Sequence, residues 1–179
     1  MADGAVGPTP SQTVGPFFRF GMAWTNARDL VDPQTPEAVS IGGRVLDGAG
    51  DAVPDAVVEI WQADANGGFP PDSPRPWTGF GRAFTDAAGE FSFITVKPGP
   101  TDEVQAPHIE VSVFARGLLQ RLVTRLYFPD EAAANADDQL LQSIQDPARR
   151  VTLVASSDGA GLRFDIRLQG DDETVFFVY

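Results

Sequence analysis

The chain has 179 residues, of which 42% are hydrophobic, so it is long enough to bury one sizeable core but leaves little room for two. Its 25 acidic residues outnumber the 13 basic ones, and the formal net charge of -12 disfavours nucleic acid and anionic membranes as partners. The absence of cysteine excludes disulfides and thiolate chemistry. Because no signal peptide or transmembrane stretch is recognisable, we expect a soluble cytoplasmic protein.

Residues 1–40 are predicted to form an N-terminal arm followed by a connection. The stretch TPSQTVGPFF is too rich in proline, glycine and small polar residues for a regular element, and Gly15 with Pro16 fixes a bend. Three aromatic residues then need a surface to bury against: Phe17, Phe18 and Phe20. On local signals alone, a plain turn followed by an edge strand is favoured. Residues 21–40 fit a long connection with one helical turn.

Residues 41–179 are predicted to form one all-β domain, a sandwich of roughly eight antiparallel strands. Short segments of alternating apolar and polar residues are separated there by turns rich in glycine, aspartate and proline. The predicted strands are residues 41–47, 55–64, 80–85, 90–96, 106–117, 121–128, 150–154, 161–169 and 174–179. Hairpins are expected to join the first strand to the second, the third to the fourth, and residues 150–154 to 161–169.

Residues 130–149 interrupt this pattern of strands. They are rich in alanine, contain leucine and begin with acidic residues, which favours helix over strand. We therefore expect one or two short helices before the last strands.

The stretch APHIEVSVFARG, residues 106–117, holds the single histidine of the chain and is predicted to be a central strand. One face carries apolar side chains that we expect to pack: Ile109, Val111, Val113 and Ala115. The other face carries His108 and Glu110, two residues apart, as a strand presents two metal ligands or an acid–base pair. Arg116 and Gly117 follow at its end.

Six ordered segments of the chain resemble the intradiol ring-cleavage dioxygenases. They are TPSQTVGPFF, GRVLDGAGDAVPDAVVEIWQADANG, FGRAFTDAAGEFSFITVKPG, APHIEVSVFARG, TRLYFPDE and RFDIRLQGDDETVFF. They span nearly the whole chain, and the arm and FARG stretches are most similar to the alpha chains of members that cleave protocatechuate. The resemblance implies a β-sandwich core and a hetero-oligomer of alpha and beta chains. It also implies that an Fe(III)-containing beta chain opens protocatechuate with O2 to 3-carboxy-cis,cis-muconate, a step of the beta-ketoadipate pathway.

The matching positions of this chain lack the iron ligands that the resemblance implies for beta chains, which are two tyrosines and two histidines. The two histidines lie two apart on a strand, and here they correspond to His108 and Glu110. Phe69 stands where one tyrosine is expected, and GPTDEVQ contains no second tyrosine. Because phenylalanine has no phenolate oxygen, we expect no iron or other metal on this chain and a hydrogen-bonded structural role for His108.

The same resemblance implies that the arm lies against the iron pocket of the partner beta chain. Thr13, Gly15 and Pro16 would line that pocket, and Arg116 would approach the same region. Glycine lets the backbone approach a flat aromatic ring, and arginine offers a cation to a carboxylated substrate. Without the resemblance, Arg116 is equally consistent with an ordinary arginine at the end of a strand. None of these substrate-binding residues is expected to be catalytic.

Two other functions remain open at this point. A non-catalytic ligand-binding or interaction β-sandwich would be stable alone and would need no second chain. A self-sufficient metalloenzyme using His108, Glu110 and a distant aspartate would bind metal as an isolated chain.

Overall fold

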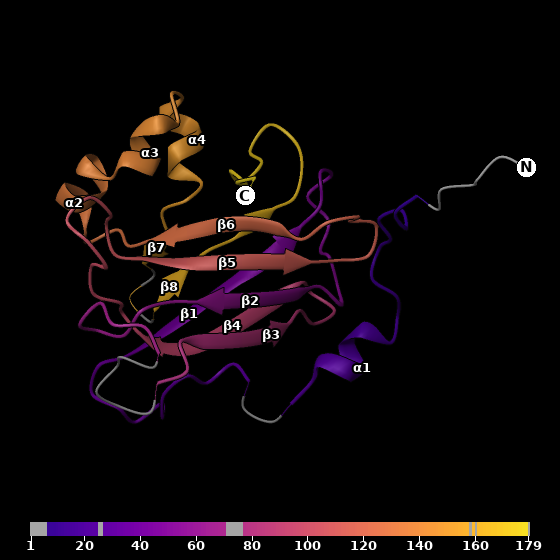
Figure 1. Ribbon diagram of the computed structural model, residues 1–179, viewed down its shortest axis with the longest axis horizontal. Coiled ribbons are helices and arrows are strands. Elements are labelled where there is room, and N and C mark those ends of the chain that lie inside the picture. The colour runs from indigo at the N-terminus through magenta and orange to yellow at the C-terminus, as the bar shows by residue number, and fades with distance from the viewer. Residues whose placement is uncertain (1–6, 25–26, 71–76, 158, 160, 179) are drawn as a thin grey trace, which may run out of the picture.

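The computed structural model describes residues 7–24, 27–70, 77–157, 159 and 161–178, and two β-sheets stack face to face in it (Figure 1). Within these residues there are nine strands: β1 (Ala38–Leu46), β2 (Val57–Trp61), β3 (Phe80–Phe84), β4 (Glu90–Val96), β5 (His108–Phe114), β6 (Leu122–Tyr127), β7 (Ser156–Ser157), β8 (Leu162–Arg163) and β9 (Ile166–Arg167). The helices are α1 (Phe18–Met22), α2 (Ala132–Asp137), α3 (Gln139–Ser143) and α4 (Pro147–Val151). None of the helices in the described residues is long and apolar enough to cross a membrane.

One sheet has the order β4-β1-β8-β7, with β9 also pairing with β1, and the other has the order β3-β2-β5-β6. The central strand predicted around His108 is confirmed, because β5 lies between β2 and β6. Buried and half-buried residues alternate along its whole length. The β-sandwich predicted from the sequence is therefore the fold of the chain, although β8 and β9 pair with β1 in parallel.

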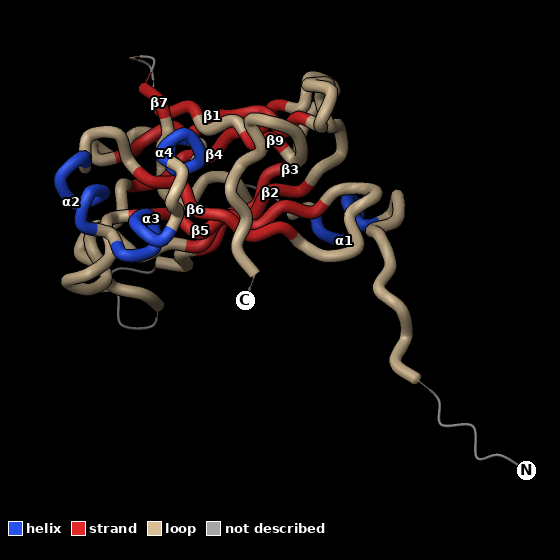
Figure 2. The backbone as a smooth tube through the Cα atoms, turned by 90° about the horizontal axis from the view of Figure 1, so that it is seen from above, coloured by secondary structure: helices blue, strands red, loops and turns tan. Residues whose placement is uncertain are grey.

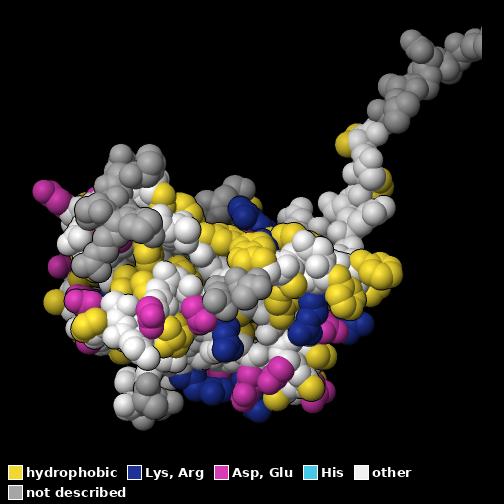
Figure 3. All heavy atoms as spheres, turned by 90° about the horizontal axis from the view of Figure 1, so that it is seen from below, with side chains coloured by type: hydrophobic (Ala, Val, Ile, Leu, Met, Phe, Trp, Pro, Cys, Tyr) yellow, Lys and Arg dark blue, Asp and Glu magenta, His cyan; other side chains and the backbone are white. Residues whose placement is uncertain are grey.

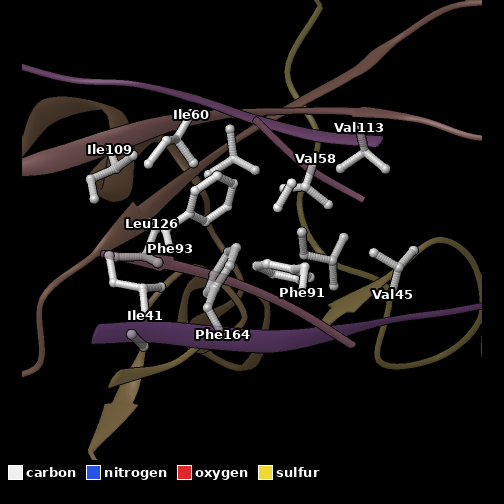
Figure 4. Close-up of a cluster of buried hydrophobic side chains, with 14 of the residues drawn as sticks. Ile41, Val45, Val58, Ile60, Phe91, Phe93, Ile109, Val113, Leu126 and Phe164 are labelled. Carbon is white, nitrogen blue, oxygen red and sulfur yellow. The ribbon is translucent and has the colours of Figure 1, made fainter. Parts of the chain in front are cut away.

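The main core lies between the two sheets, where side chains from both inner faces meet (Figure 4). Ile41, Phe91 and Phe164 come from the first sheet and the segment beside β8, while Val58, Ile109 and Val113 come from the second. All six are almost completely shielded from solvent. Burial of such aliphatic and aromatic side chains is the main force that holds two sheets together.

A second apolar cluster lies on the outer face of the second sheet, under the short helices gathered at one end of the molecule (Figure 2). Its buried members are Ala106, Tyr127, Leu141 and Leu153. Successive side chains of β6 point to opposite faces, so Leu126 faces the main core and Tyr127 faces outward. Because helices cover this outer face, Tyr127 is buried in the second cluster. Buried and half-buried residues consequently do not alternate along β6 as they do along β5, because both faces of β6 are covered.

The predicted hairpins between the first and second strands, and between the third and fourth, are wrong. In both cases the strands belong to different sheets, because β1 pairs with β4 and β2 pairs with β3. The expected turn after β3 does form, and Asp86 Oδ1 accepts hydrogen bonds from the N–H groups of Ala88 and Glu90 at 2.8 and 2.9 Å. The turn carries the chain across the sandwich instead of back beside the strand that it left.

Two predicted strands near the C-terminus do not form as expected. Much of residues 150–154 belongs to α4 or its end, because Asp146 caps the helix and Pro147 begins it. Residues 174–178 make only an isolated bridge between Phe177 and Val123, and Tyr179 lies outside the described residues. The segment 130–149 leads into three short helices instead of one or two.

The N-terminal arm is irregular up to residue 15 and ends in the single turn of α1, which begins at Phe18. The helical turn expected within residues 21–40 thus lies earlier in the chain, and no edge strand follows Pro16. The division into residues 1–40 and 41–179 stays a prediction.

Candidate functional site

The arm meets the turn at the end of β5, so two stretches far apart in sequence form one site. Thr13 Oγ1 accepts a hydrogen bond from the backbone N–H of Gly117 at 2.7 Å. Gly117 lies in the turn after β5 and has a φ of 93°, a left-handed conformation that favours glycine. The residues predicted from the resemblance to face the partner's pocket are therefore brought together within this chain.

An open hollow of about 490 Å³ lies beside this contact. Gly15, Pro16 and Arg116 line it, together with Arg19 from α1 and Asp55 from the loop before β2. A Cβ atom placed on Gly15 would meet nothing within 4 Å, so the backbone here borders free space. The hollow is of a size that accommodates a small aromatic molecule.

Charged side chains give the hollow an excess of positive charge in an otherwise acidic chain. Asp55 lies between two guanidinium groups, at 2.9 Å from Arg19 Nη1 and 3.7 Å from Arg116 Nη2. The Arg19 guanidinium also lies over the Phe84 ring, 5.3 Å from its centroid. Sequence reasoning missed Arg19 and Asp55, because nothing local indicates that residues on a helix and in a distant loop share an ion pair.

The aromatic residues of the arm divide into one that packs on the sandwich and two that do not. Phe18 lies against Phe114, with 5.7 Å between ring centroids. Phe17 and Phe20 are 79% and 76% exposed. Figure 3 shows hydrophobic side chains at the base of the arm with basic and acidic side chains beside them. This surface combines the aromatic and arginine residues that protein interfaces favour.

His108, on the outer face of β5, is half-buried and hydrogen-bonded. Its Nδ1 lies 2.8 Å from the carbonyl oxygen of Ala106, which can only accept, so Nδ1 carries the proton. Burial lowers the pKa of His108, opposed by this hydrogen bond, and the neighbouring Arg125 lowers it further. The neutral ring also lies 5.7 Å from the Tyr127 ring. These contacts suit the structural role expected for His108.

Glu110, which takes the place of the second histidine, is paired with a cation. It lies opposite Arg125 in the β5–β6 register, and Arg125 Nε donates to Glu110 Oε1 at 2.8 Å. Arg125 Nη1 donates in turn to Gln105 Oε1 at 2.9 Å. The charge of Glu110 is thus balanced by a largely buried guanidinium.

Phenolate oxygen is not supplied to this face by any residue that the structure describes. Tyr127 is fully buried, and burial strongly raises the pKa of its hydroxyl, which donates to Asp138 Oδ1 at 3.3 Å. Phe69 is stacked on Trp61 with an interplanar angle of 12°. Among the described residues, no cluster of three histidine, cysteine, aspartate or glutamate side chains could hold a metal ion. The residues present do not fit a ferric tyrosinate site.

The fold and this arrangement define a β-sandwich in which His108 and Glu110, on the outer face of β5, are held by a hydrogen bond and an ion pair within the chain. The sequence profile of the dioxygenase family matches residues 15–170, and the chain belongs to that family. It is 46% identical to the protocatechuate 3,4-dioxygenase alpha chain of Pseudomonas putida, over 94% of this chain and 95% of that one. It is 36% identical to the protocatechuate 3,4-dioxygenase beta chain of Burkholderia cepacia, over 77% of this chain and 67% of that one.

A solved structure supports the same assignment. The dioxygenase domain of a dioxygenase–carbohydrate-binding protein fusion from Streptomyces sp. SirexAA-E superposes with a TM-score of 0.63 at 30% identity. The match covers 92% of this chain and 99% of that domain. The resemblance seen in the sequence motifs is thus confirmed by family, by relatives and by fold.

Proposed function

We propose that this chain is the alpha subunit of a protocatechuate 3,4-dioxygenase and completes the substrate pocket of an iron-binding beta subunit. The complex would cleave protocatechuate with O2 to 3-carboxy-cis,cis-muconate in the cytoplasm, as part of the catabolism of aromatic compounds. The high identity to alpha chains over almost the full length supports this assignment over a non-catalytic binding sandwich.

One structural observation carries the proposal. Gly15 and Pro16 of the arm and Arg116 after β5 line a hollow that opens to the surface, whereas the face of β5 that carries His108 and Glu110 offers no phenolate from a described residue. A chain whose described residues do not supply the iron ligands but do line an open hollow is suited to complete the site of a partner.

Each of the four predicted site residues has a distinct proposed role at the shared site. Gly15 and Pro16 form a thin, rigid wall against the aromatic ring of the substrate, and Arg116 attracts its carboxylate. Thr13 holds the arm in place through its hydrogen bond to Gly117. None of these groups transfers a proton or an electron, so the role of this chain is binding and orientation.

Iron in the beta subunit would supply the oxygen chemistry of the complex. The residues of the present chain do not fit ferric iron, and no step of the reaction is assigned to a metal bound here.

Expression of the chain alone and together with its beta chain tests the proposal. We expect the isolated chain to be colourless, without stoichiometric iron and inactive, because tyrosinate ligands give such sites their visible absorption. The co-purified complex should contain iron, absorb visible light and consume protocatechuate and O2. Stoichiometric iron with a tyrosinate band on the isolated chain would contradict the proposal, as would a complex that does not form or does not cleave protocatechuate.

Arg116→Ala tests the proposed contact with the carboxylate. Loss of a charge-assisted hydrogen bond worth about 1.5 to 3 kcal/mol should lower kcat/KM for protocatechuate about ten- to a hundredfold. Catechol, which lacks the carboxylate, should be affected much less. Equal kcat/KM values for variant and unchanged complexes with both substrates would show that Arg116 is structural.

A further inference from the structure

We propose that Asp55 is a positioning residue for the carboxylate-binding Arg116 and, through Arg19, for the arm. This inference rests on the proposed function, and it adds two residues to the substrate pocket that neither the motifs nor the resemblance indicated. The carboxylate of Asp55 connects Arg19 on the arm side of the hollow with Arg116 on the side of β5.

The backbone of Asp55 indicates that its position is imposed by its surroundings. Its φ is 64°, and it is the one non-glycine residue with positive φ among the described residues. Aspartate tolerates this left-handed conformation better than most residues, but such a conformation still persists only where other contacts require it. Here Asp55 is the second residue of the Pro54–Asp55 turn before β2, and this turn presents its side chain to the two guanidinium groups.

The two ion pairs of Asp55 differ in kind. Arg19 Nη1 donates a hydrogen bond to Asp55 Oδ1 at 2.9 Å, and Phe84 supports the other side of that guanidinium. Arg116 Nη2 lies 3.7 Å from Asp55 Oδ2, beyond hydrogen-bonding distance, and its side chain is 62% exposed. Asp55 therefore holds Arg19 by a hydrogen bond but only attracts Arg116, which remains able to turn its donors toward a ligand.

The charges of the three side chains suit a ligand with one carboxylate. Two guanidinium groups and one carboxylate leave a single positive charge at the hollow, and one carboxylate on the substrate would balance it. Arg19 lies in α1, only a few residues after the bend at Gly15 and Pro16. Its ion pair with Asp55 therefore also restrains the wall that these two residues form. Asp55 thereby couples the position of the ring to the position of the charge.

Asp55→Asn distinguishes positioning from a simple effect of charge. The substitution raises the local positive charge, so an effect of charge alone would strengthen binding of protocatechuate. If Asp55 positions Arg116, KM for protocatechuate should instead rise about tenfold, with kcat changed less than about threefold. The ratio of kcat/KM for protocatechuate to that for catechol should fall too, by a smaller factor, because the part of the effect that acts through Arg19 and the arm is common to both substrates.

Arg19→Gln and a double variant separate the two connections. Arg19→Gln should loosen only the arm and lower kcat/KM for both substrates alike, leaving their ratio unchanged. In an Arg116→Ala background, Asp55→Asn should cause no further fall in the ratio, because the residue through which it acts is gone. Arg163→Gln, which removes a similarly exposed arginine paired with Asp165 at 2.9 Å, is the matched control and should change neither ratio nor KM.

All variants are measured as the assembled complex, with its iron content and gel-filtration profile recorded. The positioning role is wrong if the wild-type complex is active and Asp55→Asn leaves unchanged, or raises, the ratio of kcat/KM for protocatechuate to that for catechol. The proposed function would then still stand. The same holds for an Asp55→Asn chain that fails to assemble, since Asp55 would then be an interface residue. Failure of the wild-type complex to cleave protocatechuate would contradict the proposed function itself.

Discussion

At the scale of single residues, Gly15 is informative because the chain itself does not require a glycine there. A Cβ atom would meet nothing within 4 Å, and Gly15 is absent from the glycines with positive φ. Gly15→Leu should therefore leave the folding of the isolated chain unchanged. In the complex, the added side chain should project into the pocket and lower kcat/KM for both protocatechuate and catechol by about tenfold or more, with iron content unchanged.

Gly7→Leu provides the control for this substitution. Gly7 lies in the same arm, and a Cβ atom there also meets nothing within 4 Å. The control should retain the steady-state parameters of the unchanged complex. If both leucine variants behave alike, in either direction, the wall proposed for Gly15 is wrong.

His108 should make the stability of the chain depend on pH. Burial lowers its pKa in the folded chain below the ordinary value of 6.5, so the unfolded chain binds the proton at higher pH than the folded one. The stability contribution is complete above about pH 6.5 and is lost as the pH falls through the lower, folded-state pKa. Urea unfolding of the unchanged chain and of His108→Gln, between about pH 5 and 8, measures the difference. Parallel curves for the two proteins across this range would refute the expectation.

At the scale of secondary-structure elements, α3 and α4 offer a matched comparison of helix caps. Asp146 begins α4 and accepts one hydrogen bond, from Ala148 N at 2.9 Å. Asp138 begins α3 and is buried; it accepts from Leu141 N at 2.9 Å, from Ala106 N at 2.9 Å and from the Tyr127 hydroxyl at 3.3 Å. It therefore joins the helix to the start of β5 and to β6.

Replacement of each aspartate by alanine should have unequal effects on stability. Asp146→Ala should lower the free energy of unfolding by about 1 kcal/mol, as is usual for an exposed cap. Asp138→Ala should cost about 3 kcal/mol or more, because buried donors lose their acceptor as well. Equal losses in urea unfolding would mean that the buried links of Asp138 contribute nothing beyond the cap.

The elements also show what the sequence could predict and what it could not. β5 was predictable because only its inner face packs in the main core, so its apolar residues alternate cleanly. The hairpins around β1–β2 and β3–β4 were not, because turn chemistry is local whereas the choice of sheet depends on strands elsewhere in the chain. The start of α4 had a recognisable signal in Asp146 followed by Pro147, which the apolar pattern of residues 150–154 obscured.

The candidate site was predictable only in part for a similar reason. Thr13, Gly15, Pro16 and Arg116 followed from the resemblance, and the structure brings them together, although their roles remain proposals. Arg19 and Asp55 belong to the same hollow but lie 36 positions apart, and no periodicity or motif connects them.

At the scale of the whole molecule, the exposed aromatic surface at the base of the arm predicts how the chain behaves alone. Phe17 and Phe20 expose large apolar areas in the described structure, and we expect the isolated chain to self-associate or to be poorly soluble. The beta chain should suppress this by covering the surface. A Phe17→Ser/Phe20→Ser variant should be more monomeric in sedimentation experiments and should bind the beta chain more weakly.

Val151→Ser is the matched control, since Val151 is 68% exposed but lies at the end of α4. It should change neither self-association nor assembly. A monodisperse unchanged chain, or a serine double variant that assembles normally, would count against an interface at the base of the arm.

The parallel pairing of β1 with β8 and β9 also governs how the protein can fold during its own synthesis. Ile41 pairs with Leu162 and Val45 with Ile166, so one edge of β1 waits for residues that are translated much later. β4 can pair with the other edge much earlier. Until residue 167 emerges, the nascent chain carries an open strand edge, which is a site for mispairing with neighbouring chains. A pause in translation between β4 and β8 should therefore leave this edge of β1 open to other chains for longer than a pause before β1.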